Sequence, residues 1–158
     1  MNSSAFVYVT YIATTPEQLW KALTDETFTV KYWFGRKVRS DWKEGSPVEF
    51  VGDDGIASAY GVVLECQPYR RLSYTFHWAD DQAARERPTK VTFELQPADM
   101  AVKLSLRHEQ LLPEDWREDD GGGFASIAKD GVNNGWPFIL SNLKSLLETG
   151  APLKSIKA

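Results

Sequence analysis

The sequence predicts an α+β fold, in which a curved antiparallel sheet of about seven strands wraps around one long helix near the C-terminus. Three segments, residues 71–78, 90–96 and 102–109, alternate apolar and polar side chains. This alternation is typical of an antiparallel sheet with one buried face and one wet face. Residues 135–150 instead repeat apolar side chains at helical spacing, so a helix is available to cover the apolar face of the sheet.

The C-terminal helix is the most strongly patterned element. Its apolar face is expected to hold Trp136, Ile139, Leu140, Leu143, Leu146 and Leu147. Its polar face is expected to hold Ser141, Asn142, Lys144, Ser145 and Glu148. Gly150 suits the C-terminus, because it has no Cβ. The helix either runs from about residue 124 to 148 with a bend near Gly135 to Pro137, which we favour, or begins at Pro137.

One strand and two short helices precede the rest of the sheet. Residues 5–12 are rich in β-branched and aromatic side chains and predict a strand, although both of its faces are apolar. Thr15 is a good N-cap and Pro16 suits the first helical position, so a short helix begins here. Thr24 or Asp25 is expected to cap a second short helix.

Six more strands are expected after these helices. Their predicted ranges are 38–42, 47–51, 57–66, 71–78, 90–96 and 102–109. The pair Asp54-Gly55 marks a hairpin turn, residues 79–88 form a polar loop, and residues 97–100 form a tight turn. The glycine-rich residues 113–123 let the chain cross onto the sheet. One helix cannot fill the whole concave face, so we expect a cavity between the helix and the sheet.

Size and composition point to one domain over residues 1–150, followed by a flexible tail over residues 151–158. The single cysteine, Cys66, excludes an internal disulfide and fits a reducing, cytoplasmic location. The formal net charge of −4 argues against a nucleic-acid partner. No apolar run approaches the roughly 18 residues of a membrane span, and no signal peptide is visible.

Motifs spread over nearly the whole chain carry a family resemblance. They are TPE (15–17), LW (19–20), ALTD (22–25), SDWKEGSPV (40–48), GVVLE (61–65), RLSY (71–74), VTFEL (91–95), GWP (135–137) and LSNLK (140–144). These motifs resemble the activator of heat-shock-protein-90 ATPase homologue family, a branch of the START-like (SRPBCC) superfamily. The resemblance implies the helix-grip fold that this family shares with lipid-transfer domains, polyketide cyclases and birch-pollen-allergen-like proteins.

The resemblance also bears on partners. It implies a small hydrophobic molecule held between the long helix and the sheet. The eukaryotic co-chaperones that name the family carry a further N-terminal domain that contacts the chaperone. At 158 residues this chain is too short to contain that domain, so a chaperone is the second expectation for the partner.

The inward faces of the strands and of the long helix supply the candidate ligand-binding residues. They are Trp33, Tyr74, Phe76, Trp78, Phe93, Leu106, His108, Trp136, Leu140 and Leu143. Any one of these side chains, taken alone, also fits a plain core position. His108 is either a general base beside a cavity or a core histidine whose nitrogens are hydrogen-bonded, and we favour the second interpretation. No catalytic residue is assigned.

Other chemical groups have structural interpretations. Cys66 lies between apolar neighbours and is expected to be a small buried side chain rather than a nucleophile. The acidic clusters 53–54, 80–81 and 118–120 lack the ligand spacing of a calcium loop. Residues 121–123 are glycines without the lysine and hydroxyl of a phosphate loop. The sequence therefore implies no metal, nucleotide or covalent cofactor.

These observations favour a protein that binds a small hydrophobic, lipid- or polyketide-like molecule. Three alternatives stay open. The first is a co-chaperone-like module that binds proteins in the stress response. The second is a cyclase- or hydrolase-like enzyme that uses His108, and the third is a packed protein without a ligand.

Overall fold

A seven-stranded antiparallel sheet forms the larger part of the described fold. The computed structural model describes residues 4–79, 86–111 and 132–153. The strands are β1 (Ser4–Ile12), β2 (Lys37–Arg39), β3 (Pro47–Val51), β4 (Ala57–Gln67), β5 (Arg71–Trp78), β6 (Thr89–Ala98) and β7 (Ala101–Leu111). They lie in the order β1-β7-β6-β5-β4-β3-β2, so β1 and β2 are the edge strands. The predicted α+β fold with about seven antiparallel strands is confirmed.

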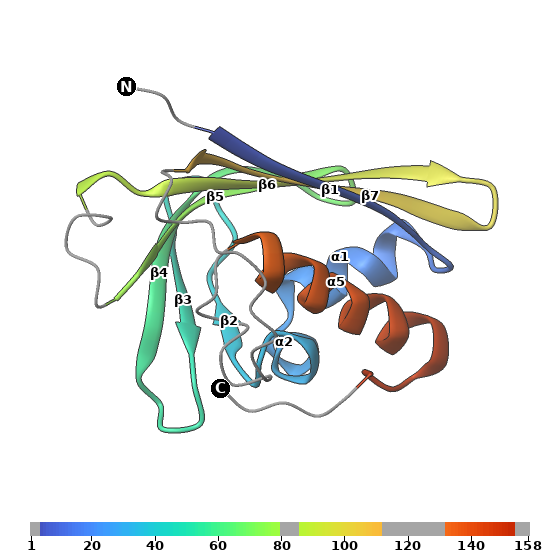
Figure 1. Ribbon diagram of the computed structural model, residues 1–158, viewed down its shortest axis with the longest axis horizontal. Coiled ribbons are helices and arrows are strands. Elements are labelled where there is room, and N and C mark those ends of the chain that lie inside the picture. Colours follow the sequence, from blue (N-terminus) through green and yellow to red (C-terminus); the bar gives the residue numbers. More distant parts are fainter. Residues whose placement is uncertain (1–3, 80–85, 112–131, 154–158) are drawn as a thin grey trace.

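The sheet is strongly curved, and the helices lie inside the curve. Strands β2, β3 and β4 turn away from the plane of β1, β6 and β7, and the three labelled helices occupy the space between the two parts (Figure 1). Two irregularities coincide with this turn. Strand β4 shifts register against β5 between Val63 and Glu65, and β3 shifts against β4 between Phe50 and Val51. Bulges bend a strand and increase its twist, so they help the sheet to wrap around the helices.

Gly61 in β4 allows the backbone of β5 to come close. A Cβ at this position would lie 1.8 Å from the carbonyl oxygen of Thr75. The next backbone N–H, that of Val62, donates to the hydroxyl of Thr75 at 2.9 Å. Because the obstructing atom belongs to the backbone, no side-chain rotation can relieve the clash, and the local pairing of β4 with β5 requires glycine.

We expect Gly61→Ala to lower the free energy of unfolding by about 2–3 kcal/mol, because the two strands must separate to admit the methyl group. Urea denaturation measures this change. Gly52→Ala is the matched control, since a Cβ there meets only the Asp54 carboxylate, at 3.4 Å. The control should change the stability by less than about 1 kcal/mol. Equal losses of unfolding free energy in both variants would show that the close approach at Gly61 does not contribute to stability.

Both short helices begin at the capping residues that the sequence suggests. Helix α1 (Pro16–Thr24) has Thr15 as its N-cap, and the Thr15 hydroxyl accepts a hydrogen bond from the N–H of Gln18 at 3.2 Å. Helix α2 (Glu26–Tyr32) is capped by Asp25, whose carboxylate accepts from the N–H of Thr27 at 2.8 Å. Of the two predicted caps for the second helix, Asp25 is therefore correct.

Helix α5 (Val132–Thr149) runs through Pro137 without ending there. The interpretation in which the helix begins at Pro137 is therefore wrong, while the predicted extension over residues 124–131 lies outside the described residues. Proline costs the helix only one hydrogen bond here, because the missing N–H would have faced the carbonyl of residue 133 in the opening turns. Gly150 ends the helix with φ +88°, and its N–H donates to the carbonyl of Leu146, as predicted.

The face that α5 buries differs from the prediction at one residue. Trp136, Ile139, Leu140, Leu143 and Leu146 are buried, and Leu147 is half-buried. Asn142 was predicted on the polar face but is only 2% exposed. Its side-chain oxygen accepts a hydrogen bond from the N–H of Leu153 at 2.9 Å, so the chain that follows the helix folds back over it. The predicted tail is described only up to residue 153.

Trp42 is not part of a strand, although residues 38–42 were predicted as one. Strand β2 ends at Arg39, and Trp42 has a φ of +55°. The indole N–H of Trp42 donates to the carbonyl of Thr24 at the end of α1, 2.8 Å away. A contact between segments distant in sequence therefore decides the backbone here, which local propensity does not register.

Pairing settles the face of β1, which its sequence leaves open. Phe6 lies opposite His108 and Tyr8 opposite Leu106, so these two rings share the inner face of β7. Val7, Val9 and Tyr11 lie on the outer face and are about half exposed.

The outer face of strands β5 and β6 is less exposed to solvent than predicted. Ser73 and Thr92 are 1% and 3% exposed, and their hydroxyls are 3.1 Å apart across β5 and β6. Each hydroxyl therefore has a partner, as buried polar groups require.

Candidate functional site

Nine of the ten predicted ligand-binding residues belong to one hydrophobic cluster between α5 and the concave face of the sheet, and the tenth, His108, contacts the rings of Phe76 and Trp136 in that cluster. Strands β5, β6 and β7 contribute six of them: Tyr74, Phe76, Trp78, Phe93, Leu106 and His108. Helix α5 contributes Trp136, Leu140 and Leu143. The remaining residue, Trp33, is the C-cap of α2. Trp78 is half-buried and the others are buried. That these residues bind a ligand stays a prediction.

Trp33 is the hub of the aromatic part of this cluster. Its ring centroid lies 5.8 Å from that of Trp136 on the helix and 6.4 Å from that of Phe76 on the sheet. Phe50 of β3 and Phe34 lie 5.0 Å and 6.2 Å away. The contacts with Trp136 and Phe34 are edge to face, a geometry that aromatic quadrupoles favour. One side chain thus connects α5, strands β3 and β5, and the segment after α2.

His108 is held at both ring nitrogens by a chain of hydrogen bonds. The indole N–H of Trp136 donates to Nδ1 at 2.9 Å, and Nε2 lies 2.7 Å from the hydroxyl of Thr89. That hydroxyl donates its own hydrogen to the carbonyl of Phe76 at 2.8 Å. Since the hydroxyl hydrogen is already used, Nε2 must carry the proton and donate to Thr89. The imidazole is therefore neutral, with Nδ1 as the acceptor.

Burial lowers the pKa of His108 to about 3, because the imidazolium would lose its hydration. A second proton on Nδ1 would also face the N–H of Trp136 directly. At neutral pH the only lone pair of the ring is occupied, so accepting a proton from a substrate would require breaking the Trp136 bond. Of the two interpretations of His108, this geometry is that of a satisfied core histidine.

Two further groups have shifted pKa values with structural causes. Burial raises the pKa of the Tyr74 phenol, which stays protonated at neutral pH. Burial, with a smaller contribution from Glu44, raises the pKa of the half-buried Cys66 thiol. A raised pKa lowers the fraction of the reactive thiolate, so Cys66 is not an activated nucleophile. Among the described residues, no group of three or more His, Cys, Asp or Glu side chains is arranged to hold a metal ion.

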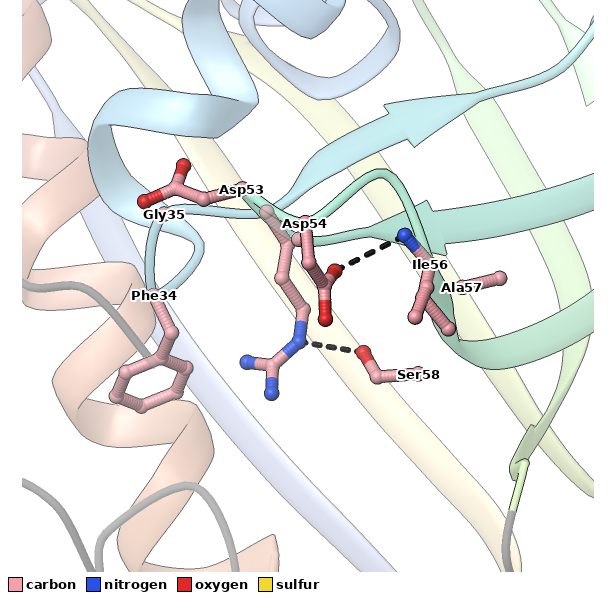
Figure 2. A pocket seen from close by; sticks show the side chains of 9 residues that line it. Phe34, Gly35, Asp53, Asp54, Ile56, Ala57 and Ser58 are labelled. Carbon is pink, nitrogen blue, oxygen red and sulfur yellow. Dashed lines mark hydrogen bonds between the residues drawn. The ribbon is translucent and has the colours of Figure 1, made fainter.

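A cavity of about 280 Å³ opens where the cluster meets the hairpin between β3 and β4. Phe34, Arg36 and Ser58 contribute to its wall, together with the turn residues Asp53 and Asp54. In Figure 2 the Phe34 ring and the Ser58 hydroxyl lie on opposite sides of the site, and the Asp54 carboxylate accepts a hydrogen bond from the N–H of Ile56. The cavity therefore joins a polar turn to the aromatic cluster.

Arg36 connects this cavity to the cluster, and the sequence-based prediction missed it. Arg36 is only 8% exposed, and its guanidinium lies 5.6 Å from the centre of the Trp78 ring. Arginine side chains are usually exposed, so the residue type alone does not indicate that this one is buried. Its position directly after the aromatic segment Tyr32–Gly35 was the available hint. Gly35 and Phe34 both have positive φ, a sharp turn that sets the direction in which Arg36 leaves the backbone.

The described helices include none that is long and apolar enough to cross a membrane.

Comparisons with known proteins agree with this architecture. MLL2253 from Mesorhizobium loti is 25% identical, with a TM-score of 0.68 over 91% of this chain and 96% of that protein. PFC0360w, an HSP90 activator from Plasmodium falciparum, is 22% identical, with a TM-score of 0.67 over 90% of this chain and 95% of that one. DynU16, a protein in the dynemicin biosynthetic locus, is 16% identical, with a TM-score of 0.68 over 94% of this chain and 48% of DynU16.

Among curated protein sequences, none matches this chain. A family model does match, and it covers residues 13–148, from the end of β1 almost to the end of α5. This range contains the two capped helices, six of the seven strands (β2 to β7) and most of the helix that packs against the sheet. The chain therefore belongs to the family of Activator of Hsp90 ATPase homolog 1-like proteins.

Proposed function

We propose that this protein binds a small hydrophobic molecule, lipid- or polyketide-like, between α5 and the sheet. The observation that carries the proposal is the junction between the cavity at Phe34 and the aromatic cluster behind it. Trp78, the half-buried member of the cluster, lies 5.1 Å from Phe76 and faces Arg36 of the cavity wall. A guest that enters here meets aromatic surface on one side and a few polar groups on the other, the usual composition of a small-molecule site.

The family and its neighbours add support of a more general kind. The similarity to DynU16, which lies in the dynemicin biosynthetic locus, fits a role in handling a small molecule. Apolar burial would supply the affinity, at about 0.8 kcal/mol for each CH₂ group removed from water. A guest that reaches deeper than Trp78 must displace packed rings such as Trp33, so the shape of the bound state depends on which rings rotate.

Trp78→Leu is expected to weaken binding of a two-ring aromatic guest, such as a naphthol, about tenfold, because the ring that packs behind Arg36 of the cavity wall is lost. Titration followed by NMR measures the affinity and maps the site. The wild-type shifts should fall in the cavity wall, residues 34–36 and 56–58, and in the cluster behind it, residues 72–78, 91–95 and 136–147. Tyr60→Leu is the matched control, since Tyr60 lies on β4 with its side chain 38% exposed, stacked against His77 on the outer face. Shifts on that outer face, or none, would refute the proposal.

A co-chaperone-like role in the stress response is the second candidate. It is favoured by the similarity to PFC0360w and by the exposed apolar side chains Val7, Val9 and Tyr11 on the edge strand β1. Exposed apolar residues on an edge strand are suited to contact with another protein. Either role fits a cytoplasmic protein. Binding of purified Hsp90 to β1, detected in the same NMR experiment, would favour this candidate over the first.

A further inference from the structure

Within the part of the chain that the structure describes, Arg36 is a buried cation without a buried anion beside it. Its Nε donates to the hydroxyl of Ser58 at 2.6 Å, and its guanidinium packs against Trp78. Its Nη1 is buried and has no hydrogen-bond partner among the described residues. The ion pairs formed within the described residues involve Arg39, Arg71, Arg107 and Lys144, but not Arg36. The guanidinium therefore holds unused donor capacity at the wall of the cavity.

This arrangement is costly for a protein that has no use for it. Burial lowers the pKa of Arg36, but a guanidinium stays charged at any physiological pH. A charge removed from water normally gains a partner of opposite sign or is replaced by an apolar side chain. Ser58 does not supply that partner, because its hydroxyl is neutral and itself donates to the carbonyl of Phe50 at 3.3 Å. An anion that binds in the cavity would supply it.

The two acidic side chains of the cavity do not fill this role. Asp53 and Asp54 lie in the exposed hairpin turn, whereas Arg36 is buried at the inner wall. One oxygen of Asp54 is already bonded to the N–H of Ile56 at 2.9 Å, which stabilises the turn (Figure 2). Their negative charge at the mouth disfavours a multiply charged guest such as a phosphate. A single carboxylate on an apolar body suits the cavity better, since Phe34 lines the cavity and Trp78 packs against the guanidinium.

We propose that Arg36 binds the carboxylate of an acidic hydrophobic ligand, with Nη1 as the donor. This inference rests on the proposed function and specifies its ligand class as aromatic or alicyclic carboxylic acids. The apolar body of the ligand lies toward Phe34 and Trp78, and the acid group lies toward Ser58. Arginine suits this task because its flat guanidinium can pack on an aromatic ring while its edge donates hydrogen bonds.

The test compares 1-naphthoate with its uncharged amide, 1-naphthamide, by calorimetric titration near neutral pH. Wild-type protein should bind naphthoate at least about tenfold more tightly than naphthamide, as expected for a charge-assisted hydrogen bond. Arg36→Met should remove this preference by weakening naphthoate alone, and Arg36→Lys should retain part of it. Arg39→Met is the matched control, because Arg39 is half exposed and paired with Glu26, and it should behave as wild type.

The outcomes separate this inference from the function on which it rests. The role of Arg36 would be refuted if the wild type bound both compounds equally, or if Arg36→Met still preferred naphthoate. Either result would still support a hydrophobic binding site. Binding of neither compound would overturn both. If Arg36→Met does not fold, the side-chain Nε resonance of Arg36 in the wild type gives the answer. It should shift with naphthoate and not with naphthamide, and the opposite result would refute the proposal.

Discussion

Leu143→Ala is expected to lower the free energy of unfolding by about 2–5 kcal/mol, the range for large-to-small changes in a well-packed core. Leu143 has no exposed surface and lies midway along the buried face of α5, between Leu140 and Leu146. The truncation removes apolar contacts and leaves a void that neighbours on both the helix and the sheet can close only in part. Urea denaturation followed by circular dichroism measures the loss.

The same chemical change at Leu153 is the control. Leu153 is 62% exposed and follows the helix, so Leu153→Ala should alter the stability by no more than about 0.5 kcal/mol. A loss below about 0.5 kcal/mol for Leu143→Ala as well would mean that the helix does not rest on this face in solution. In that case the position of the candidate ligand site would fail together with the packing of α5.

Local signals in the sequence predicted much of this fold because the physics they reflect is local. The alternation of Leu72, Tyr74 and Phe76 sets the inner face of β5, whatever the strand pairs with. Thr15 and Asp25 cap helices with their own side chains, and Gly150 accepts a φ that other residues avoid. Each of these features depends on neighbours within a few positions, so no knowledge of the tertiary structure is needed.

The features that were missed depend on contacts between distant residues. Trp42 leaves the predicted strand because its indole reaches the end of α1, and Asn142 is buried because the chain returns over it. The bond between Trp136 and His108 joins residues 28 positions apart. The sequence pattern placed both residues on inward faces, but it does not determine which inward-facing atoms form hydrogen bonds with each other. Arg36 was missed for the same reason, since its burial follows from the way the turn at Phe34 and Gly35 meets the β3–β4 hairpin.

The stability of the protein is expected to fall by about 2 kcal/mol between about pH 7.5 and about pH 5, owing to His108 alone. The pKa of His108 is lowered from 6.5 to about 3 in the folded protein, so in this window the unfolded chain binds a proton that the folded protein does not. Stability therefore rises with pH across the window and is fully present only above the unfolded value. Urea denaturation at several pH values measures the slope.

Between about pH 5 and about pH 7.5, the change in stability reports mainly on the protonation of His108. The folded-state pKa values of Asp25 and Glu148 are lowered, mainly by hydrogen bonds from Thr27 and Lys144, so their contributions are lost largely below pH 5. His108→Gln should remove the slope, whereas His77→Gln, which removes the only other histidine, should leave the His108 bonds and their slope in place. NMR titration of the wild type tests the same point without a variant, because the His108 ring should stay neutral at pH 5. A midpoint near the ordinary value would mean that water reaches the imidazole, and with it a freely accessible base between the helix and the sheet.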